Sequence, residues 1–320
     1  MSEVTHRFVE TNGIRMHIAE QGTGPLVLLC HGFPESWYSW RHQLPALAAA
    51  GYHAVAPDMR GYGQTDRPEE TERYTQLHLV ADMVGLLGAL GAETAVIVGH
   101  DWGAPVAWNA ALMRPDQFRA VIALSVPYAP RGGTPPTRAM KRAAGETFMY
   151  MLYFQTLGVA EAELERDVRA TLRRVLYAIS GDAPPVPVLA KGAKFLDALA
   201  EPSALPGWLS EADLDFYTGE FARTGFRGGL SWYRNLDRTW ELMAAYQGAR
   251  ITRPALFIAG DRDMVVLRNR AAMERLPETV ADLRKLVLLP GCGHWTQQER
   301  PAEVNAEILA FLGTLDEARR

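Results

Sequence analysis

Short apolar runs, most of them closed by turn-forming residues, recur near both ends of the chain and predict the strands of a sheet. The first two runs flank Asn12-Gly13, a dipeptide that favours a tight turn between antiparallel strands. The later runs are continuously apolar, which is typical of strands buried on both faces of a parallel sheet. We predict eight strands, over residues 6–10, 15–20, 25–30, 52–57, 94–98, 120–126, 255–260 and 283–289.

Segments with helical periodicity separate several of these strands, so the chain is expected to form an α/β fold whose mostly parallel sheet is flanked by helices. This alternation breaks where prolines and glycines crowd residues 127–136, and residues 141–247 are mostly helical and rich in aromatic side chains. An inserted helical lid explains that pattern. We predict a first part of the core over 1–130, the lid over 131–247 and a second part of the core over 248–320. The predicted core helices cover residues 77–90, 103–112, 267–276 and 301–312.

Composition narrows the class of protein without identifying a chemistry. The 320 residues carry a net charge of -4 with both signs well mixed, which gives no indication of nucleic-acid binding. We expect no secretory signal, because residues 1–7 lack an apolar stretch, and no membrane span, because no apolar run reaches about 18 residues. Cys30 and Cys292 lie far apart and are expected to be free thiols, which favours a cytoplasmic location.

Residues 94–103 combine a buried strand, a sharp turn and the start of a helix. Gly99 and Gly103 lie two residues on either side of Asp101. Glycine at both positions lets a very tight turn avoid collisions with the neighbouring strand and helix. This spacing is typical of a nucleophile elbow, which presents its central side chain for attack. The alternative is a solvated turn aspartate in a hydrolase that has lost its activity.

Aspartate at the position where most such elbows carry serine restricts the chemistry. A serine that attacked a saturated carbon would form an ether, which water does not readily cleave. A carboxylate that attacks a saturated carbon forms an ester, and an activated water can then attack the carbonyl of that ester. Asp101 therefore points to displacement at an alkyl carbon, either by opening an epoxide or by expelling a halide.

An elbow nucleophile needs a base and an acid that orients the base, and both are expected in loops after later strands. His294 lies in the loop after the last predicted strand and is the candidate base for activating water. Asp261 and Asp263 both follow the strand at 255–260, and either could instead cap the next helix. The spacing alone does not choose between them.

Hydrolysis of the ester places negative charge on an oxygen of Asp101, and backbone N–H groups are expected to stabilise it. Trp102, directly after the nucleophile, offers one N–H group. Phe33, in the loop after the strand at 25–30, offers the other. These two N–H groups form the predicted oxyanion hole.

Together these motifs resemble those of the soluble epoxide hydrolases of the α/β-hydrolase superfamily, over nearly the whole chain. The similar segments are His31-Gly32-Phe33-Pro34-Glu35-Ser36-Trp37, Gly99-His100-Asp101-Trp102-Gly103, Leu152-Tyr153-Phe154-Gln155, Trp232-Tyr233-Arg234-Asn235 and Gly291-Cys292-Gly293-His294-Trp295-Thr296. The resemblance implies the α/β-hydrolase fold without the N-terminal phosphatase domain of the two-domain mammalian members.

The same resemblance implies roles for individual residues. It favours Asp263 over Asp261 as the orienting acid. It makes Tyr153 and Tyr233 the lid tyrosines that bind and protonate the epoxide oxygen, a role suited to a phenol that stays protonated at neutral pH. Glu35 is expected to help position the hydrolytic water and His294, and the peptide bond before Pro34 is expected to be cis.

We further expect a small apolar epoxide as substrate, no cofactor, no metal, and a monomer or homodimer in the cytoplasm. The residues expected to line the substrate pocket are Phe33, Trp37, Trp102, Met149, Phe154 and Trp232. A haloalkane dehalogenase with the same nucleophile is the main alternative, although such enzymes usually have Asn where Phe33 lies and do not need the tyrosines. A non-catalytic small-molecule receptor is the other alternative.

Overall fold

The computed structural model describes residues 3–317 and contains one eight-stranded sheet with the order β1-β2-β4-β3-β5-β6-β7-β8. β1 and β2 form the predicted hairpin, β2 pairs antiparallel with β4, and every later pairing in the sheet is parallel. The strands are β1 (Thr5–Thr11), β2 (Ile14–Gln21), β3 (Leu26–Cys30), β4 (His53–Pro57), β5 (Ala95–His100), β6 (Phe118–Leu124), β7 (Ala255–Gly260) and β8 (Leu283–Leu289). The predicted mostly parallel sheet is confirmed.

Side chains of the central strands alternate between two buried clusters, one on each face of the sheet. Along β3, Leu26, Leu28 and Cys30 join the cluster on one face, whereas Val27 and Leu29 join the other. The first cluster packs against α2 (Gln76–Ala89) and α3 (Gly103–Met113), and the second against α1 (Gln43–Ala49) and α15 (Pro301–Glu317). Burial on both faces explains why these strands have no polar side of their own.

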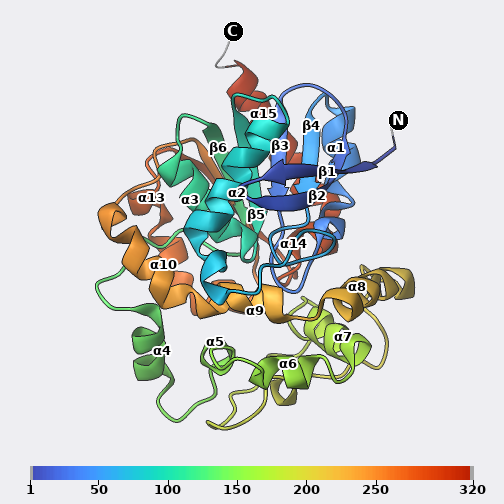
Figure 1. The fold of residues 1–320 in the computed structure, drawn as a ribbon, viewed down its shortest axis with the longest axis vertical. Helices are drawn as coiled ribbons and strands as arrows, with labels where there is room; N and C mark the ends of the chain where they lie inside the picture. Colours follow the sequence, from blue (N-terminus) through green and yellow to red (C-terminus); the bar gives the residue numbers. More distant parts are fainter. Residues whose placement is uncertain (1–2, 318–320) are drawn as a thin grey trace.

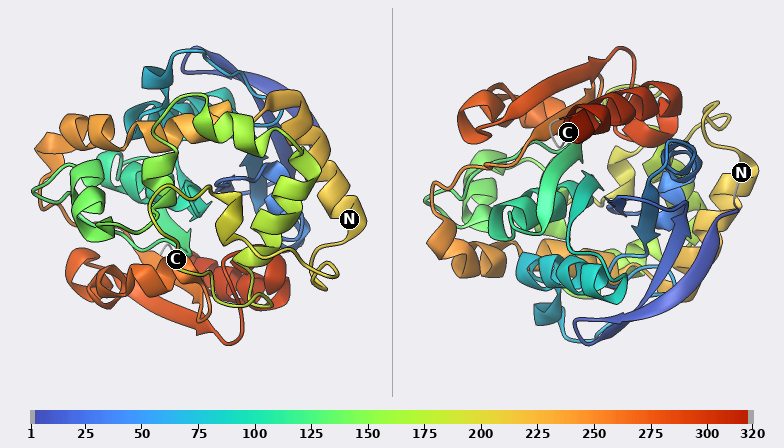
Figure 2. Two further views of the ribbon diagram at one scale, coloured as in Figure 1. Left: turned by 90° about the horizontal axis from the view of Figure 1, so that it is seen from below. Right: turned by 90° about the horizontal axis from the view of Figure 1, so that it is seen from above.

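The chain between β6 and β7 forms a helical layer below the sheet in Figure 1, and the left view of Figure 2 shows these helices lying across its end. They are α4 (Pro136–Ala144), α5 (Tyr150–Tyr153), α6 (Val159–Leu164), α7 (Val168–Ala178), α8 (Glu211–Thr224), α9 (Arg227–Arg234) and α10 (Leu236–Leu242), with short 3₁₀ turns at η3 (Leu196–Ala198) and η4 (Met243–Tyr246). The helical character of the predicted lid is therefore observed, while its boundaries at 131 and 247 stay a prediction.

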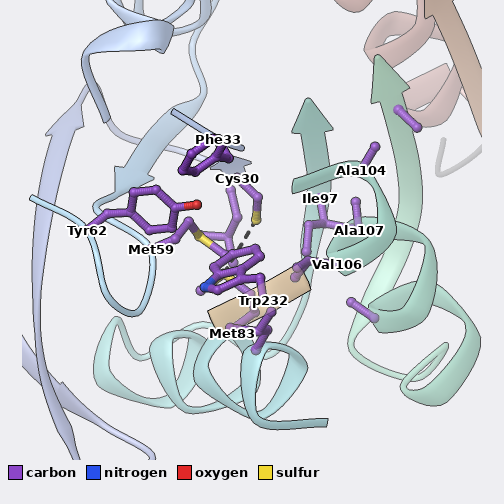
Figure 3. Close-up of a cluster of buried hydrophobic side chains, with 14 of the residues drawn as sticks. Cys30, Phe33, Met59, Tyr62, Met83, Ile97, Ala104, Val106, Ala107 and Trp232 are labelled. Carbon is purple, nitrogen blue, oxygen red and sulfur yellow. Dashed lines mark hydrogen bonds between the residues drawn. The ribbon is translucent and has the colours of Figure 1, made fainter. Parts of the chain in front are cut away.

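One lid helix, α9, packs directly against the core. Gly228 of α9 lies so close to Gly61 that a Cβ atom added at 228 would be 2.1 Å from the Gly61 carbonyl oxygen. Trp232 is 1% exposed and donates from its indole to the Arg60 carbonyl oxygen at 3.1 Å. Figure 3 shows Trp232 among core residues that include Met59 and Met83. The lid and the core therefore share one hydrophobic cluster.

One predicted helix differs from the structure, and several short elements were not predicted. The helix predicted over 267–276 is divided into α11 (Met264–Arg268), α12 (Arg270–Glu274) and α13 (Leu276–Thr279). It starts earlier than predicted because the Asp263 carboxylate accepts the Val265 N–H and caps α11. The sequence analysis also missed α1, α14 (Thr296–Glu299), and the 3₁₀ turns η1 (Trp37–Trp40) and η2 (Thr71–Tyr74).

Candidate active site

Asp101 lies at the tip of a turn between β5 and α3, with a positive backbone φ of 49° that non-glycine residues rarely adopt. The flanking glycines are required by close approach. A Cβ atom at Gly99 would lie 2.0 Å from the Gly103 carbonyl oxygen, and one at Gly103 would lie 2.0 Å from the Cys30 carbonyl oxygen. The geometry of a nucleophile elbow is therefore present.

One oxygen of the Asp101 carboxylate is held by the loop after β3. The Phe33 N–H donates to Asp101 Oδ1 at 2.7 Å, and the Phe33–Pro34 peptide bond is cis, as predicted. A Cβ atom at Gly32 would lie 2.3 Å from Asp101 Oδ1 and 2.7 Å from the Trp102 nitrogen. Oδ1 and the Trp102 nitrogen thus border the same small space, where the oxyanion hole was predicted.

The other carboxylate oxygen faces His294. His294 Nε2 lies 3.3 Å from Asp101 Oδ2, and His294 Nδ1 lies 3.0 Å from Asp263 Oδ2. Asp263 is fully buried, whereas Asp261 is exposed and accepts the Gly291 N–H instead. Of the two aspartates that the spacing left open, the structure brings Asp263 to the imidazole.

The buried His294 lies between two carboxylates. Burial alone lowers the pKa of His294, but the Asp263 and Asp101 carboxylates together raise it well above its ordinary value. The resting site therefore favours an imidazolium at position 294. Removing the charge of Asp101 would remove one of the two groups that raise this pKa.

Glu35 lies behind the triad and does not contact the His294 side chain. Its Oε2 accepts hydrogen bonds from His100 Nδ1 and from the Gly32 N–H, both at 2.8 Å. His100 Nε2 in turn donates to the His294 carbonyl oxygen at 2.7 Å. A carboxylate and a carbonyl oxygen can only accept, so each ring nitrogen of His100 faces an acceptor. Glu35 is thus linked through His100 to the backbone that carries the candidate base.

The buried Glu35 carboxylate is expected to make folding stability depend on pH in acid. Burial alone would raise the pKa of Glu35, but the His100 charge and hydrogen bond overcome it and lower the pKa from 4.5 to about 2. A lowered folded-state pKa adds stability above about pH 4.5 that is lost as the pH falls toward 2. At neutral pH this contribution is on the order of 3 kcal/mol.

Chemical denaturation at a series of pH values measures this effect. The free energy of unfolding of the parent should fall more between pH 4.5 and pH 2 than that of Glu35→Gln. The exposed Glu93→Gln is the matched control and should follow the parent. Parallel curves for the parent and Glu35→Gln would contradict the proposed ionisation of Glu35.

A cavity of about 330 Å³ opens onto Asp101 between the core and the lid. Most of its lining is apolar or aromatic, which suits an apolar substrate. The lining includes Gln76, Trp102, Asn109, Leu112, Arg131, Met140, Tyr150, Met151, Trp232, Leu236, Thr239, Trp240 and Met243.

The structure corrects the predicted pair of lid tyrosines. Tyr150, at the start of α5, lines the cavity beside Asp101, and its ring centroid lies 6.0 Å from that of Tyr233. Burial and the Asp101 charge raise the pKa of both phenols, so both stay protonated at neutral pH. Tyr153 instead donates its hydroxyl to Glu163 Oε2 at 2.7 Å, outside the cavity lining.

Of the residues predicted to line the substrate pocket, some lie at the cavity and others do not. Trp102 and Trp232 line the cavity as predicted, and the Phe33 backbone reaches Asp101. Trp37 packs instead against Phe216 and His6 and does not belong to the lining. Phe154 is fully buried between Phe33, Phe195 and Tyr233, and neither it nor Met149 belongs to the lining.

Within residues 3–317, no group of three or more His, Cys, Asp or Glu side chains is arranged so that it could hold a metal ion. No helix in the same range is both long and apolar enough to cross a bilayer. Cys30 and Cys292 are both buried free thiols, as expected.

Comparisons with known proteins agree with this geometry. The family model for the α/β-hydrolase fold matches residues 25–301. Epoxide hydrolase A of Mycobacterium tuberculosis is 52% identical to this chain over 99% of both sequences. The structure of an epoxide hydrolase from an endophytic Streptomyces has a TM-score of 0.95 at 51% identity, covering 98% of this chain and 96% of its own. Epoxide hydrolase A from Mycobacterium thermoresistibile gives a TM-score of 0.93 at 51% identity, with coverages of 97% and 98%.

Proposed function

Because this chain belongs to the α/β-hydrolase fold family and is an epoxide hydrolase, we propose that Asp101 opens the epoxide through a covalent ester that water activated by His294 then hydrolyses. This proposal is supported above all by the different partners of the two Asp101 carboxylate oxygens. Its Oδ1 is bound by the Phe33 N–H at 2.7 Å, its Oδ2 lies 3.3 Å from His294, and Asp101 lines the cavity. The two oxygens therefore have different tasks.

In the first step, Asp101 Oδ2 attacks one epoxide carbon and the bond between that carbon and the epoxide oxygen breaks. The oxygen leaves as an alkoxide, which is far more basic than a halide and needs a proton as its charge develops. Tyr150 and Tyr233 are the proposed donors, because both phenols are protonated and close to Asp101. This assignment replaces Tyr153 by Tyr150.

Ester formation changes the environment of His294. Once Asp101 is esterified it carries no charge, so one of the two carboxylates that raise the pKa of His294 is lost. His294 then gives its proton to the tyrosinate that the first step leaves and can act as a general base, while Asp263 continues to orient the ring. The first step thus converts a resting imidazolium into the base that the second step needs.

In the second step, a water molecule gives a proton to His294 and its oxygen attacks the Asp101 carbonyl carbon. Negative charge develops on Oδ1, where the Phe33 and Trp102 N–H groups are the proposed donors. Cleavage of the bond between that carbon and the ester oxygen releases the diol and restores the carboxylate. Of the two protons of the water, one ends on the second hydroxyl of the diol and the other stays on His294, which restores the resting imidazolium.

We assign Glu35 and His100 as positioning residues for this step, since they act on His294 through its carbonyl oxygen. The dehalogenase alternative is not favoured, because the relatives reported above are epoxide hydrolases. We further propose a small, largely apolar epoxide as substrate and a cytoplasmic monomer or homodimer. The apolar cavity lining and the two free thiols support these proposals.

The assignment of the tyrosines is tested by a matched pair of variants in the same helix. Tyr150→Phe should slow formation of the Asp101 ester by about 100-fold, because the alkoxide loses a proton donor. Tyr153→Phe should form the ester at a rate close to that of the parent, because the Tyr153 hydroxyl bonds Glu163. Rapid quenching followed by mass spectrometry measures ester formation. A slow Tyr153→Phe beside a fast Tyr150→Phe would reverse the assignment.

A further inference from the structure

Gln76, a residue with a buried amide group, also lines the cavity that contains Asp101. We propose that Gln76 and Thr239 form a subsite for a neutral hydrogen-bonding group, such as a hydroxyl, that the epoxide substrate carries away from its ring. This inference rests on the proposed attack by Asp101. That attack fixes where the epoxide lies in the cavity, and the subsite binds a second polar group of the same substrate at another point. It narrows the substrate class from apolar epoxides to hydroxylated ones.

Gln76 is only 6% exposed, yet both polar atoms of its side chain lack a hydrogen-bond partner among the described residues. Buried polar atoms in native proteins are almost always bonded, because leaving them unpaired costs free energy. The backbone N–H of Gln76, in contrast, has a hydrogen-bond partner, because it donates to Thr239 Oγ1 at 3.2 Å. The unpaired donor and acceptor are therefore the two amide atoms of a residue in the cavity wall.

Thr239 gives the subsite a second donor. Because Thr239 Oγ1 accepts the Gln76 N–H, the hydroxyl hydrogen of Thr239 is available to donate in another direction. Thr239 lies on the lid helix α10, whereas Gln76 begins the core helix α2. A substrate group bound between them would contact both the lid and the core.

The chemistry of Gln76 selects a neutral group over an anion. Its Nε2 donates and its Oε1 accepts, and a hydroxyl can bond both. A carboxylate only accepts, so it would leave Oε1 facing a negative charge. Arg131 also lines the cavity, but its guanidinium already donates to the Trp240 carbonyl and to Gln247, and lies 3.8 Å above the Trp240 ring. An anion subsite at Arg131 is therefore the competing outcome.

The rest of the cavity is suited to the alkyl chain of the substrate that joins its epoxide to its hydroxyl group. Flexible and aromatic apolar side chains make up much of the lining, and they offer few hydrogen-bonding partners along the way. They include Leu112, Met140, Met151, Trp232, Leu236 and Met243. A linear alkyl chain with an epoxide at one end and a hydroxyl at the other matches this distribution.

The test compares kcat/KM for terminal epoxides of graded chain length that end in a methyl, a hydroxyl or a carboxylate group. At the length that reaches Gln76, the parent should prefer hydroxyl over methyl, and Gln76→Met should reduce that ratio by roughly tenfold, as expected for two lost neutral hydrogen bonds. Gln64→Met makes the same change at an exposed position and should keep the parent ratio. Thr239→Val, which preserves the shape of the side chain, should reduce the hydroxyl-to-methyl ratio to a smaller extent. This variant replaces Gln76→Met in the test if Gln76→Met does not fold.

Two results would overturn the subsite while leaving the Asp101 chemistry intact. The first is diol formation with the same hydroxyl-to-methyl ratio in the parent, Gln76→Met and Thr239→Val at every chain length. The second is a preference for the carboxylate series that Arg131→Met abolishes. If the parent forms no diol from any of these epoxides, both this inference and the proposed attack by Asp101 fail.

Discussion

Asp101→Ala is expected to reduce epoxide hydrolysis by on the order of 10⁵-fold or more, because the variant has no group that can form the ester. The change should not unfold the elbow, since the glycines at 99 and 103 that permit the turn are kept. Diol formation measured by chromatography gives the activity. Asp261→Ala is the control in the loop that carries Asp263, and it should retain most of the activity because Asp261 is exposed and bonds only the Gly291 N–H.

The order of bond formation is visible in a single turnover in ¹⁸O-labelled water. If water attacks the Asp101 carbonyl carbon, the label enters the Asp101 carboxylate and the first diol carries none. The oxygen that joins the first diol is the one that attacked the epoxide, which we assign to Asp101 Oδ2. Label in the diol of the first turnover would mean that water attacks the epoxide directly, and Asp101 would then be a base rather than a nucleophile.

The sequence could propose the reacting residues because the geometry that points to them depends on short segments. The spacing of glycines around Asp101 describes a turn that only a few residues form, and the structure has that turn. The strands before Asp263 and His294 end within a few residues of their predicted limits, so the loops after them were placed correctly. Parallel strands in one sheet then bring these loops to the same edge.

The prediction of the lid tyrosines failed because a tertiary contact decides which of two similar residues points toward Asp101. Tyr150 and Tyr153 lie three positions apart in one helical turn, and each alone satisfies the need for a phenol. Glu163 of α6 binds the hydroxyl of Tyr153 and leaves Tyr150 toward Asp101. No local pattern reports the position of Glu163, so the sequence could not distinguish the two tyrosines.

The contacts behind the triad were also hidden from the sequence. Glu35 and His100 meet across 65 positions of the chain, and His100 reaches the His294 carbonyl across 194 positions. His100 could be noticed only as a neighbour of Asp101. The two unpaired polar atoms of Gln76 are a property of packing between α2 and α10, which periodicity does not describe.

His294→Gln is expected to stop the reaction after its first half. The ester should still form, because attack by Asp101 on the epoxide does not require a base. Hydrolysis of the ester should slow by about 10²- to 10⁴-fold, the usual contribution of a general base. Mass spectrometry of the variant after addition of a terminal epoxide should show the protein mass increased by the mass of that epoxide, with the added mass on the peptide that contains Asp101.

The double variant Asp101→Ala/His294→Gln is the matched control and should keep its unmodified mass. That comparison separates ester formation at Asp101 from alkylation elsewhere, for example at the free thiols Cys30 and Cys292. An unmodified His294→Gln that is also inactive would place His294 in the first step, as the proton donor that its raised pKa in the resting site allows. A modified variant that still releases diol at the parental rate would exclude His294 as the base and would require another group near Asp101 to activate water.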